Sequence, residues 1–353
     1  MIVLPLVSAS RLLMPIPPFF KIRTHGYFGF MNAAGEVVIE PQYLEAGEFY
    51  NGYAPVRWND QWTLLDTLGR LFLRRLYRTV GRLEEGVVRV QLVHSWGFLD
   101  QRGREVMPPK FAIAHDFCEG LSAVRFRDQA GFIDHDGQFV GPPVFAATGS
   151  FQDGLAPAAT QTGWGFVDRA GDFVLDPVWD FAQPFQGAVA VVVRDDCWGL
   201  VNRAGETLVE PQFQFVKGHA QGQFFDGMAL AYKDGLYGFV DRAGTIAVAP
   251  MFDLAGDFGE GLAPVEINGV YGYIGKTGKL AIMPYFEDAG VFSEGLAPVC
   301  TDGRWGYLDP EGQLAIKPIF EAAQPFRHGL AQVTTAGKWA YIDQQGAVIW
   351  QEP

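Results

Sequence analysis

Arginines concentrated in one part of the chain are the side chains whose type and spacing first suggest chemistry. Between residues 57 and 104 there are nine Arg and no Lys, against five Asp and Glu. A guanidinium grips a carboxylate or phosphate through two parallel hydrogen bonds, which an ammonium group does not do. This stretch therefore predicts a contact for an anion or an acidic peptide. The candidate residues are Arg70, Arg74, Arg75, Arg78 and Arg82.

The alternative is that these arginines neutralise acidic neighbours within the same array. In a strand, alternate side chains point to opposite faces. Arg70 and Arg74 would then share one face, with Arg75 on the other. The arginines need not form one patch.

A second irregular segment, residues 217–223, contains five residues more than the corresponding part of the other repeats described below. Loops that project from a rigid scaffold are common contact sites, which makes His219 a further candidate contact. Tolerated sequence drift is the alternative explanation for the insertion.

Other residue types that perform catalysis or bind metals lack the necessary spacing. The six His form no H-x-H or H-E-x-x-H pair, and Cys118, Cys197 and Cys300 are widely separated. A recurring Asp supplies one carboxylate per repeat, too few for the six to eight oxygens that Ca²⁺ takes. There is no phosphate-binding loop, nucleophile elbow or dinucleotide fingerprint. We therefore expect no metal, no cofactor and no enzyme activity.

Charge and hydropathy exclude several classes of protein. The net charge of −13 argues against a nucleic-acid binder, because phosphate contacts require Lys and Arg. No segment reaches the roughly 18 uninterrupted apolar residues of a membrane span. We expect a cytoplasmic protein with reduced thiols and an N-terminal extension over residues 1–18. Export to the cell envelope is the alternative, because Val7, Ser8 and Ala9 resemble a cleavage site.

A repeat of 34 residues dominates the chain. Its markers are a glycine, an Asp or Asn three residues earlier in nine of ten copies, and an aromatic residue seven residues earlier in nine of ten. Ala130 is the exception among the aromatic positions. One step is 39 residues, where the insertion falls. The glycines are Gly35, Gly69, Gly103, Gly137, Gly171, Gly205, Gly244, Gly278, Gly312 and Gly346.

Each repeat predicts three strands rather than helices. Pro and Gly in the middle of the unit would break a helix, whereas Trp305, Tyr307 and Asp309 alternate with Gly and Leu as strand residues do. Dipeptides such as Asp302-Gly303 suit two-residue hairpins, and Asp-x-x-Gly suits a three-residue hairpin loop. Pro318 is expected to end the third strand, because proline cannot donate to a ladder.

Ten such three-stranded antiparallel meanders form a single array over residues 19–353. A unit of 34 residues buries too little surface to be stable alone, so the units must stack. We expect an all-β, open or ring-like superhelical solenoid. The alternative is a closed β-propeller.

The repeat resembles that of the WG-repeat, or KWG-repeat, family. The resemblance rests on Trp96-Gly97-Phe98-Leu99-Asp100, on the Pro-x-aromatic segment downstream and on Glu-Gly-Leu-Ala segments such as residues 260–263. It covers about nine-tenths of the chain. Such proteins are typically bacterial and have no established catalytic role. The resemblance therefore implies a binding or scaffolding array, without site residues to transfer.

These observations predict a non-catalytic protein that presents a β-repeat surface to a protein or peptide partner. The negative net charge favours a basic partner. One alternative is a cell-envelope module that binds glycan or peptidoglycan through exposed aromatic rings. A third, an enzyme, would need acidic or His residues from several repeats to converge in one cleft.

Overall fold

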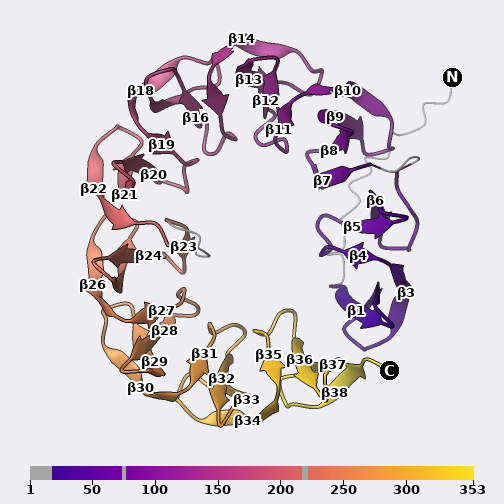
Figure 1. Cartoon of the computed structure of the whole chain (residues 1–353), viewed down its shortest axis with the longest axis vertical. Helices are drawn as coiled ribbons and strands as arrows, with labels where there is room; N and C mark the ends of the chain where they lie inside the picture. The colour runs from indigo at the N-terminus through magenta and orange to yellow at the C-terminus, as the bar shows by residue number, and fades with distance from the viewer. Residues whose placement is uncertain (1–17, 74–76, 217–221) are drawn as a thin grey trace, which may run out of the picture.

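A computed structural model describes residues 18–73, 77–216 and 222–353. Within them the chain forms ten small antiparallel sheets arranged in a ring (Figure 1). We call the sheets blades 1 to 10 in chain order. Strands run from the middle of the ring to its outside, and blade 1 lies beside blade 10. The protein is a ten-bladed β-propeller.

Successive strands of a blade occupy fixed places. The innermost strands are β4 (Glu45–Ala46), β7 (Thr79–Glu84), β11 (Ile113–Ala114), β15 (Ala147–Thr148), β19 (Phe181–Ala182), β23 (Phe224–Phe225), β27 (Leu254–Ala255), β31 (Asp288–Ala289) and β35 (Ala322–Ala323). The second strands are β1 (Phe20–Thr24), β5 (Tyr53–Trp58), β8 (Val87–Leu92), β12 (Ser122–Phe126), β16 (Ala156–Ala159), β20 (Val189–Arg194), β24 (Met228–Lys233), β28 (Leu262–Ile267), β32 (Ala297–Thr301) and β36 (Ala331–Thr335).

Two further strands complete most blades. The third strands, which carry the Trp-Gly segments, are β2 (Tyr27–Met31), β6 (Gln61–Asp66), β9 (Ser95–Asp100), β13 (Gln129–Ile133), β17 (Trp164–Val167), β21 (Cys197–Asn202), β25 (Leu236–Asp241), β29 (Val270–Gly275), β33 (Arg304–Leu308) and β37 (Lys338–Ile342). The outermost strands are β3 (Val37–Tyr43), β10 (Glu105–Phe111), β14 (Phe139–Phe145), β18 (Phe173–Trp179), β22 (Thr207–Gln214), β26 (Ile246–Phe252), β30 (Leu280–Phe286), β34 (Leu314–Phe320) and β38 (Val348–Gln351).

The innermost strand was not expected from the sequence. In blade 9, Asp288 and Ala289 pair with Cys300 and Val299 of the second strand. Only two residues take part, and they lie in the connector that the sequence predicts to be irregular. The prediction of three-stranded units is therefore wrong for eight of the ten blades within the described residues, which have four strands each.

The glycine of the Trp-Gly pair makes room for a bulge in the outermost strand. Trp305 lies opposite Phe320 and Tyr307 opposite Ile316, so the outer strand carries two extra residues at this point. A Cβ on Gly306 would lie 2.5 Å from the Ile316 oxygen, a contact that real side chains do not make. Strand β34 continues through the bulge, so the prediction that it ends at Pro318 is wrong.

The predicted turns are confirmed. Asp302 and Gly303 have φ angles of 50° and 67°, the left-handed conformation that a two-residue hairpin requires at both positions. In the Asp-x-x-Gly turn, Gly312 N donates to Asp309 O at 3.0 Å, and Asp309 Oδ1 accepts from Gln313 N at 2.7 Å. The recurring Asp therefore stabilises a turn.

The hydrophobic core lies between blades rather than within them. One cluster joins Tyr273, Ile282 and Phe286 of blade 8 to Ala297 and Val299 of blade 9, and all are buried. Burying one large apolar side chain contributes roughly 1.5–3 kcal/mol. Stacking of blades therefore supplies the stability that a single repeat lacks.

The last blade packs on the first in the same way. Phe20 and Ile22 form a buried cluster with Leu330 and Tyr341, and the Tyr341 hydroxyl donates to Lys21 O at 2.8 Å. The prediction of an open or ring-like superhelical solenoid is therefore partly wrong. The array is ring-like, but blade 10 packs on blade 1 and closes the ring. The alternative prediction, a closed β-propeller, is confirmed.

Candidate binding site between blades 4 and 5

Polar side chains that recur in the repeat are used to join neighbouring blades. Within the described parts of the chain, an acidic residue with a positive φ angle accepts a hydrogen bond from a backbone amide of the next blade in six blades, as Glu260 does from Gly295 N at 2.9 Å. This contact explains the Glu-Gly-Leu-Ala motif as a structural one. The six acceptors are Glu85, Glu119, Asp153, Asp226, Glu260 and Glu294.

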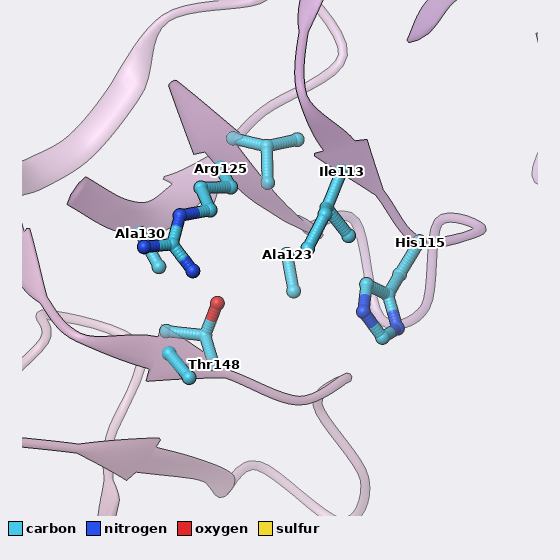
Figure 2. Close-up of a pocket in the computed structure, with 8 residues that line it drawn as sticks. Ile113, His115, Ala123, Arg125, Ala130 and Thr148 are labelled. Atoms are coloured by element: carbon cyan, nitrogen blue, oxygen red, sulfur yellow. The ribbon is translucent and has the colours of Figure 1, made fainter. Parts of the chain in front are cut away.

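A pocket opens between blades 4 and 5, near their innermost strands β11 and β15. Its empty volume, including its open mouth, is about 280 Å³. The side chains that line it on the blade 4 side include Arg125, Ala130 and His115, and Thr148 faces them from blade 5 (Figure 2). The remaining lining residues are Ile113, Ala123, Val124 and Ala147.

The pocket exists because two large side chains are missing. One repeat later, the aromatic position is Trp164, whose ring packs edge-on against Phe181 of the next blade with centroids 5.0 Å apart. The residues at these two positions in the pocket are Ala130 and Ala147. The space that an aromatic pair fills between blades 5 and 6 is thus left open between blades 4 and 5.

The polar groups of the pocket also depart from the repeat. Thr148 occupies the second position of its innermost strand, where six other blades have Ala. His115 stands where most other blades have Gly or Gln, as Gly149 and Gln183 show. In Figure 2 the Thr148 hydroxyl points toward the Arg125 guanidinium. The pocket therefore combines an apolar floor with a cation, a hydroxyl and an imidazole.

A neighbouring ion pair shapes the electrostatics of His115. Arg89 Nε lies 2.7 Å from Asp116 Oδ1, beside the imidazole. Burial lowers the pKa of His115 below its usual value, and the positive charge of Arg89 lowers it further, against an opposing effect of Asp116. The imidazole is therefore neutral at pH 7, and Arg125 carries the pocket's positive charge.

Arginines singled out from the sequence have three different sets of contacts. Arg70 pairs with Asp66 at 2.7 Å, Arg78 donates to Val93 O at 3.1 Å, and the Arg82 guanidinium lies 4.8 Å from the centre of the Tyr50 ring. The Arg70–Asp66 contact lies in the turn after strand β6, whereas Val93 lies in the turn before strand β9. These two kinds of turn are at opposite ends of the third strands. Arg70 and Arg78 are therefore on opposite faces of the ring. Arg74, Arg75 and His219 lie outside the described residues.

Blades 2 and 3 are irregular where these arginines occur. The outer part of blade 2 is reduced to isolated bridges, between Leu65 and Leu71 and between Trp62 and Tyr77. The innermost strand of blade 3, β7, has six residues instead of two. The unusual sequence is thus matched by an unusual local structure.

The described residues also bear on metal binding and on membrane insertion. The described part of the chain contains no group of three or more His, Cys, Asp or Glu that could hold a metal ion. It also contains no helix long and apolar enough to cross a membrane.

One signal in the sequence pointed to the pocket without identifying it. Ala130 is the single non-aromatic residue at the position that precedes the recurring glycine by seven residues. The exception could be seen from the sequence alone. Ala130 forms a pocket only together with Ala147, Thr148 and His115. Strand register and blade stacking, which the sequence does not reveal, bring these residues beside it.

Comparison with known proteins gives the family. The family model for the WG containing repeat matches eight stretches that together span more than half of the chain. They are residues 28–62, 96–128, 131–159, 164–196, 198–237, 237–271, 271–305 and 305–339. The chain belongs to the WG-repeat family. The unmatched residues 63–95 include the irregular parts of blades 2 and 3. Among curated proteins, none matches this sequence.

Solved structures that are similar to this WG-repeat protein have low sequence identity to it. A eukaryotic initiation factor has 11% identity and a TM-score of 0.53, with 96% of each chain covered. Hsv2p of Kluyveromyces lactis has 8% identity and a TM-score of 0.33, covering 77% of this chain and 95% of that one. PorZ of Porphyromonas gingivalis has 10% identity and a TM-score of 0.31, covering 93% and 50%. The first similarity shows the fold alone, and the other two carry no argument.

Proposed function

We propose that this WG-repeat protein is a non-catalytic scaffold that binds a protein or peptide partner, and that a partner side chain enters the pocket between blades 4 and 5. The observation that carries the proposal is Ala130, which leaves a gap where the other repeats place an aromatic ring. Two polar side chains that line the gap, Thr148 and His115, stand where most other blades have Ala and where most have Gly or Gln, respectively. A binding or scaffolding role also suits a ring of β-repeats.

The closed ring favours binding because it holds the pocket in shape. The pocket is formed by residues of two blades, and each blade is fixed by packing and by hydrogen bonds to its neighbours. A preformed site reduces the ordering cost that binding must overcome. A side chain of the partner would thus enter a space that already exists.

Peptide is favoured over glycan because of where the tryptophans lie. Glycan binding through a stripe of the recurring tryptophans would need those indole rings to be exposed. All nine Trp of the chain lie in described segments, and each is buried or half-buried. The pocket, by contrast, is small and has mixed polar and apolar walls, as a side-chain pocket has.

Selection of peptides from a random display library, with the full-length protein immobilised, tests the proposal. Peptides that bind the wild-type protein should fail to bind the Ala130→Trp variant, because the added ring occupies the pocket as Trp164 occupies its own site. The matched control is Val144→Trp, which adds the same side chain at an outer-strand position of blade 4 that is 59% exposed. Thermal unfolding of both variants establishes that the ring is intact.

The proposal is supported if the selected peptides bind the wild-type and Val144→Trp proteins and lose binding to Ala130→Trp. Peptides that bind all three proteins equally would contradict it. So would a failure to select any peptide from several independent libraries.

A further inference from the structure

We propose that the group bound in the pocket is a carboxylate on a short apolar stem, held by Arg125 and Thr148. This inference rests on the proposed function and deepens it by naming the chemistry of the ligand. The carboxylate comes from an Asp or Glu side chain of a peptide, or from a free small carboxylic acid. The experiment below distinguishes these two sources.

Blade 2 shows what an arginine at this position binds. Arg57 lies directly opposite Glu45 in the ladder between β4 and β5, and Arg57 Nη2 lies 2.8 Å from Glu45 Oε1. Two repeats later, Arg125 lies directly opposite Ile113 in the ladder between β11 and β12. The arginine is present in both blades, but blade 4 has an isoleucine in place of the carboxylate.

Arg125 is therefore left without the partner that Arg57 has. Within the described residues, its guanidinium forms no hydrogen bond or ion pair, although it is half-buried at the pocket wall. The nearby Asp116 is already paired with Arg89. A half-buried cation gains most from a carboxylate that arrives with matching geometry, because charge-assisted bidentate hydrogen bonds are the strongest of their kind.

Thr148 supplies a second donor at the same place. Its hydroxyl points toward the Arg125 guanidinium in Figure 2, so a carboxylate between them would accept from both. The corresponding residue of the neighbouring blades, Ala114 and Ala182, offers no donor. The threonine thus adds a polar group where a hydrogen-bonded ligand needs one.

The apolar walls of the pocket suit a short aliphatic stem on the ligand. Ala123, Ala130 and Ala147 contribute single methyl groups, and the empty volume is about 280 Å³. Walls of this kind suit an aliphatic stem of one or two methylene groups beside the polar groups of Arg125 and Thr148. The side chains of Asp and Glu have these dimensions.

The overall charge of the protein makes such a site specific. The net charge is −13, so most of the surface repels an acidic group, whereas this pocket attracts one. A partner that is basic overall and carries one acidic anchor satisfies both conditions.

Titration of alanine methyl resonances tests the inference in the full-length protein. The probes are a blocked Gly-Gly-Glu-Gly-Gly peptide, the same peptide with Gln in place of Glu, sodium propionate and inorganic phosphate. Methyl-labelled alanine reports directly on Ala123, Ala130 and Ala147. We expect the Glu peptide to bind at least about tenfold more tightly than the Gln peptide, since a hydrogen bond to a charged group contributes roughly 1.5–3 kcal/mol.

Two variants identify the cation responsible. Arg125→Gln, which installs the residue found one repeat earlier at Gln91, should reduce the affinity for the Glu peptide to that for the Gln peptide. Arg127→Gln is the matched control, because Arg127 is an exposed arginine in the adjacent hairpin whose guanidinium lies over the Phe126 ring. It should leave the difference between the peptides unchanged.

The outcomes distinguish a failure of the carboxylate assignment from a failure of the proposed function. Tighter binding of the Glu peptide than of propionate identifies a peptide side chain, and the reverse identifies a free carboxylic acid. Equal binding of the Glu and Gln peptides, insensitivity to Arg125→Gln, or preference for phosphate would overturn the inference. If display-selected peptides lose binding to Ala130→Trp but carry no common carboxylate, the ligand class fails while the proposed function stands.

Discussion

Arg23 and Glu352 lie 329 residues apart in the sequence and form a two-pronged ion pair that joins the first blade to the last. Arg23 Nε donates to Glu352 Oε1 at 3.1 Å, and Arg23 Nη2 donates to Oε2 at 3.0 Å. The guanidinium also lies 4.6 Å from the centre of the Trp339 ring. Among residues 18–73, 77–216 and 222–353, blades 1 and 10 share no strand, so side-chain contacts such as this pair join them.

Replacement of Glu352 by Gln should weaken this closure. The side chains of Arg23 and Glu352 are 33% and 11% exposed, so solvent screens the pair in part, and we expect a loss of about 1 kcal/mol in the free energy of unfolding at pH 7. Urea unfolding followed by circular dichroism measures the loss. Glu311→Gln, in an exposed Asp-x-x-Gly turn, is the control and should be neutral.

The same pair predicts a dependence on pH. The hydrogen bonds from Arg23 hold the pKa of Glu352 below its ordinary value of 4.5. The ionised Glu352 carboxylate therefore stabilises the folded state fully above its unfolded-state pKa. This stabilisation is lost as the pH falls through the folded-state pKa. The stability difference between wild type and Glu352→Gln should thus shrink on acidification below pH 4.5. A difference that stays constant would contradict the assignment.

Substitution of a Trp-Gly glycine should be far more costly than its size suggests. Gly306→Ala would place a Cβ 2.5 Å from Ile316 O and 2.7 Å from Pro318 N, both backbone atoms of the bulge. We expect a loss of about 3 kcal/mol, the upper range for overpacking. Gly275→Ala is the matched control, because no atom lies within 4 Å of its added Cβ. Comparable unfolding midpoints for the two variants would show that the bulge is not the reason for the glycine.

His115 should make the protein less stable in mild acid. Its pKa is lowered by burial and by Arg89, so the unfolded chain binds a proton more readily between the folded-state pKa and the usual 6.5. Stability then rises with pH across this window. His115→Gln, which installs the residue found at Gln183 and Gln324, should remove that part of the pH dependence. Removal of a histidine from an exposed turn, His25→Gln, should not remove it; an equal effect of both variants would refute the assignment.

Much of the fold could be predicted because its determinants are local. The Asp302-Gly303 and Asp309–Gly312 turns, and the alternation around Trp305, are set by residues a few positions apart. The short strand at Asp288 and Ala289 has no such signal, since it is formed by two backbone bridges. Closure of the ring depends on the rotation between blades, which packing decides and repeat spacing does not reveal.

The candidate site was harder to predict because its residues are brought together by non-local packing. The high local density of arginine predicted a contact that includes Arg70 and Arg78. In the structure these two side chains lie at turns on opposite faces of the ring, because successive strands are antiparallel. The pocket instead combines Ala130 and Arg125 with Thr148 of the next blade. Its residues follow the repeat register, and only the register together with blade stacking brings them to one place.

A crystal structure of the protein with a display-selected peptide is the most direct test of the central claim, that the pocket between blades 4 and 5 is the partner site. The account predicts a peptide side chain between Ala130 and Thr148, with an acceptor within hydrogen-bond distance of the Arg125 guanidinium. A peptide bound at the outer strands, or at any other part of the ring with the pocket left unoccupied, would contradict it.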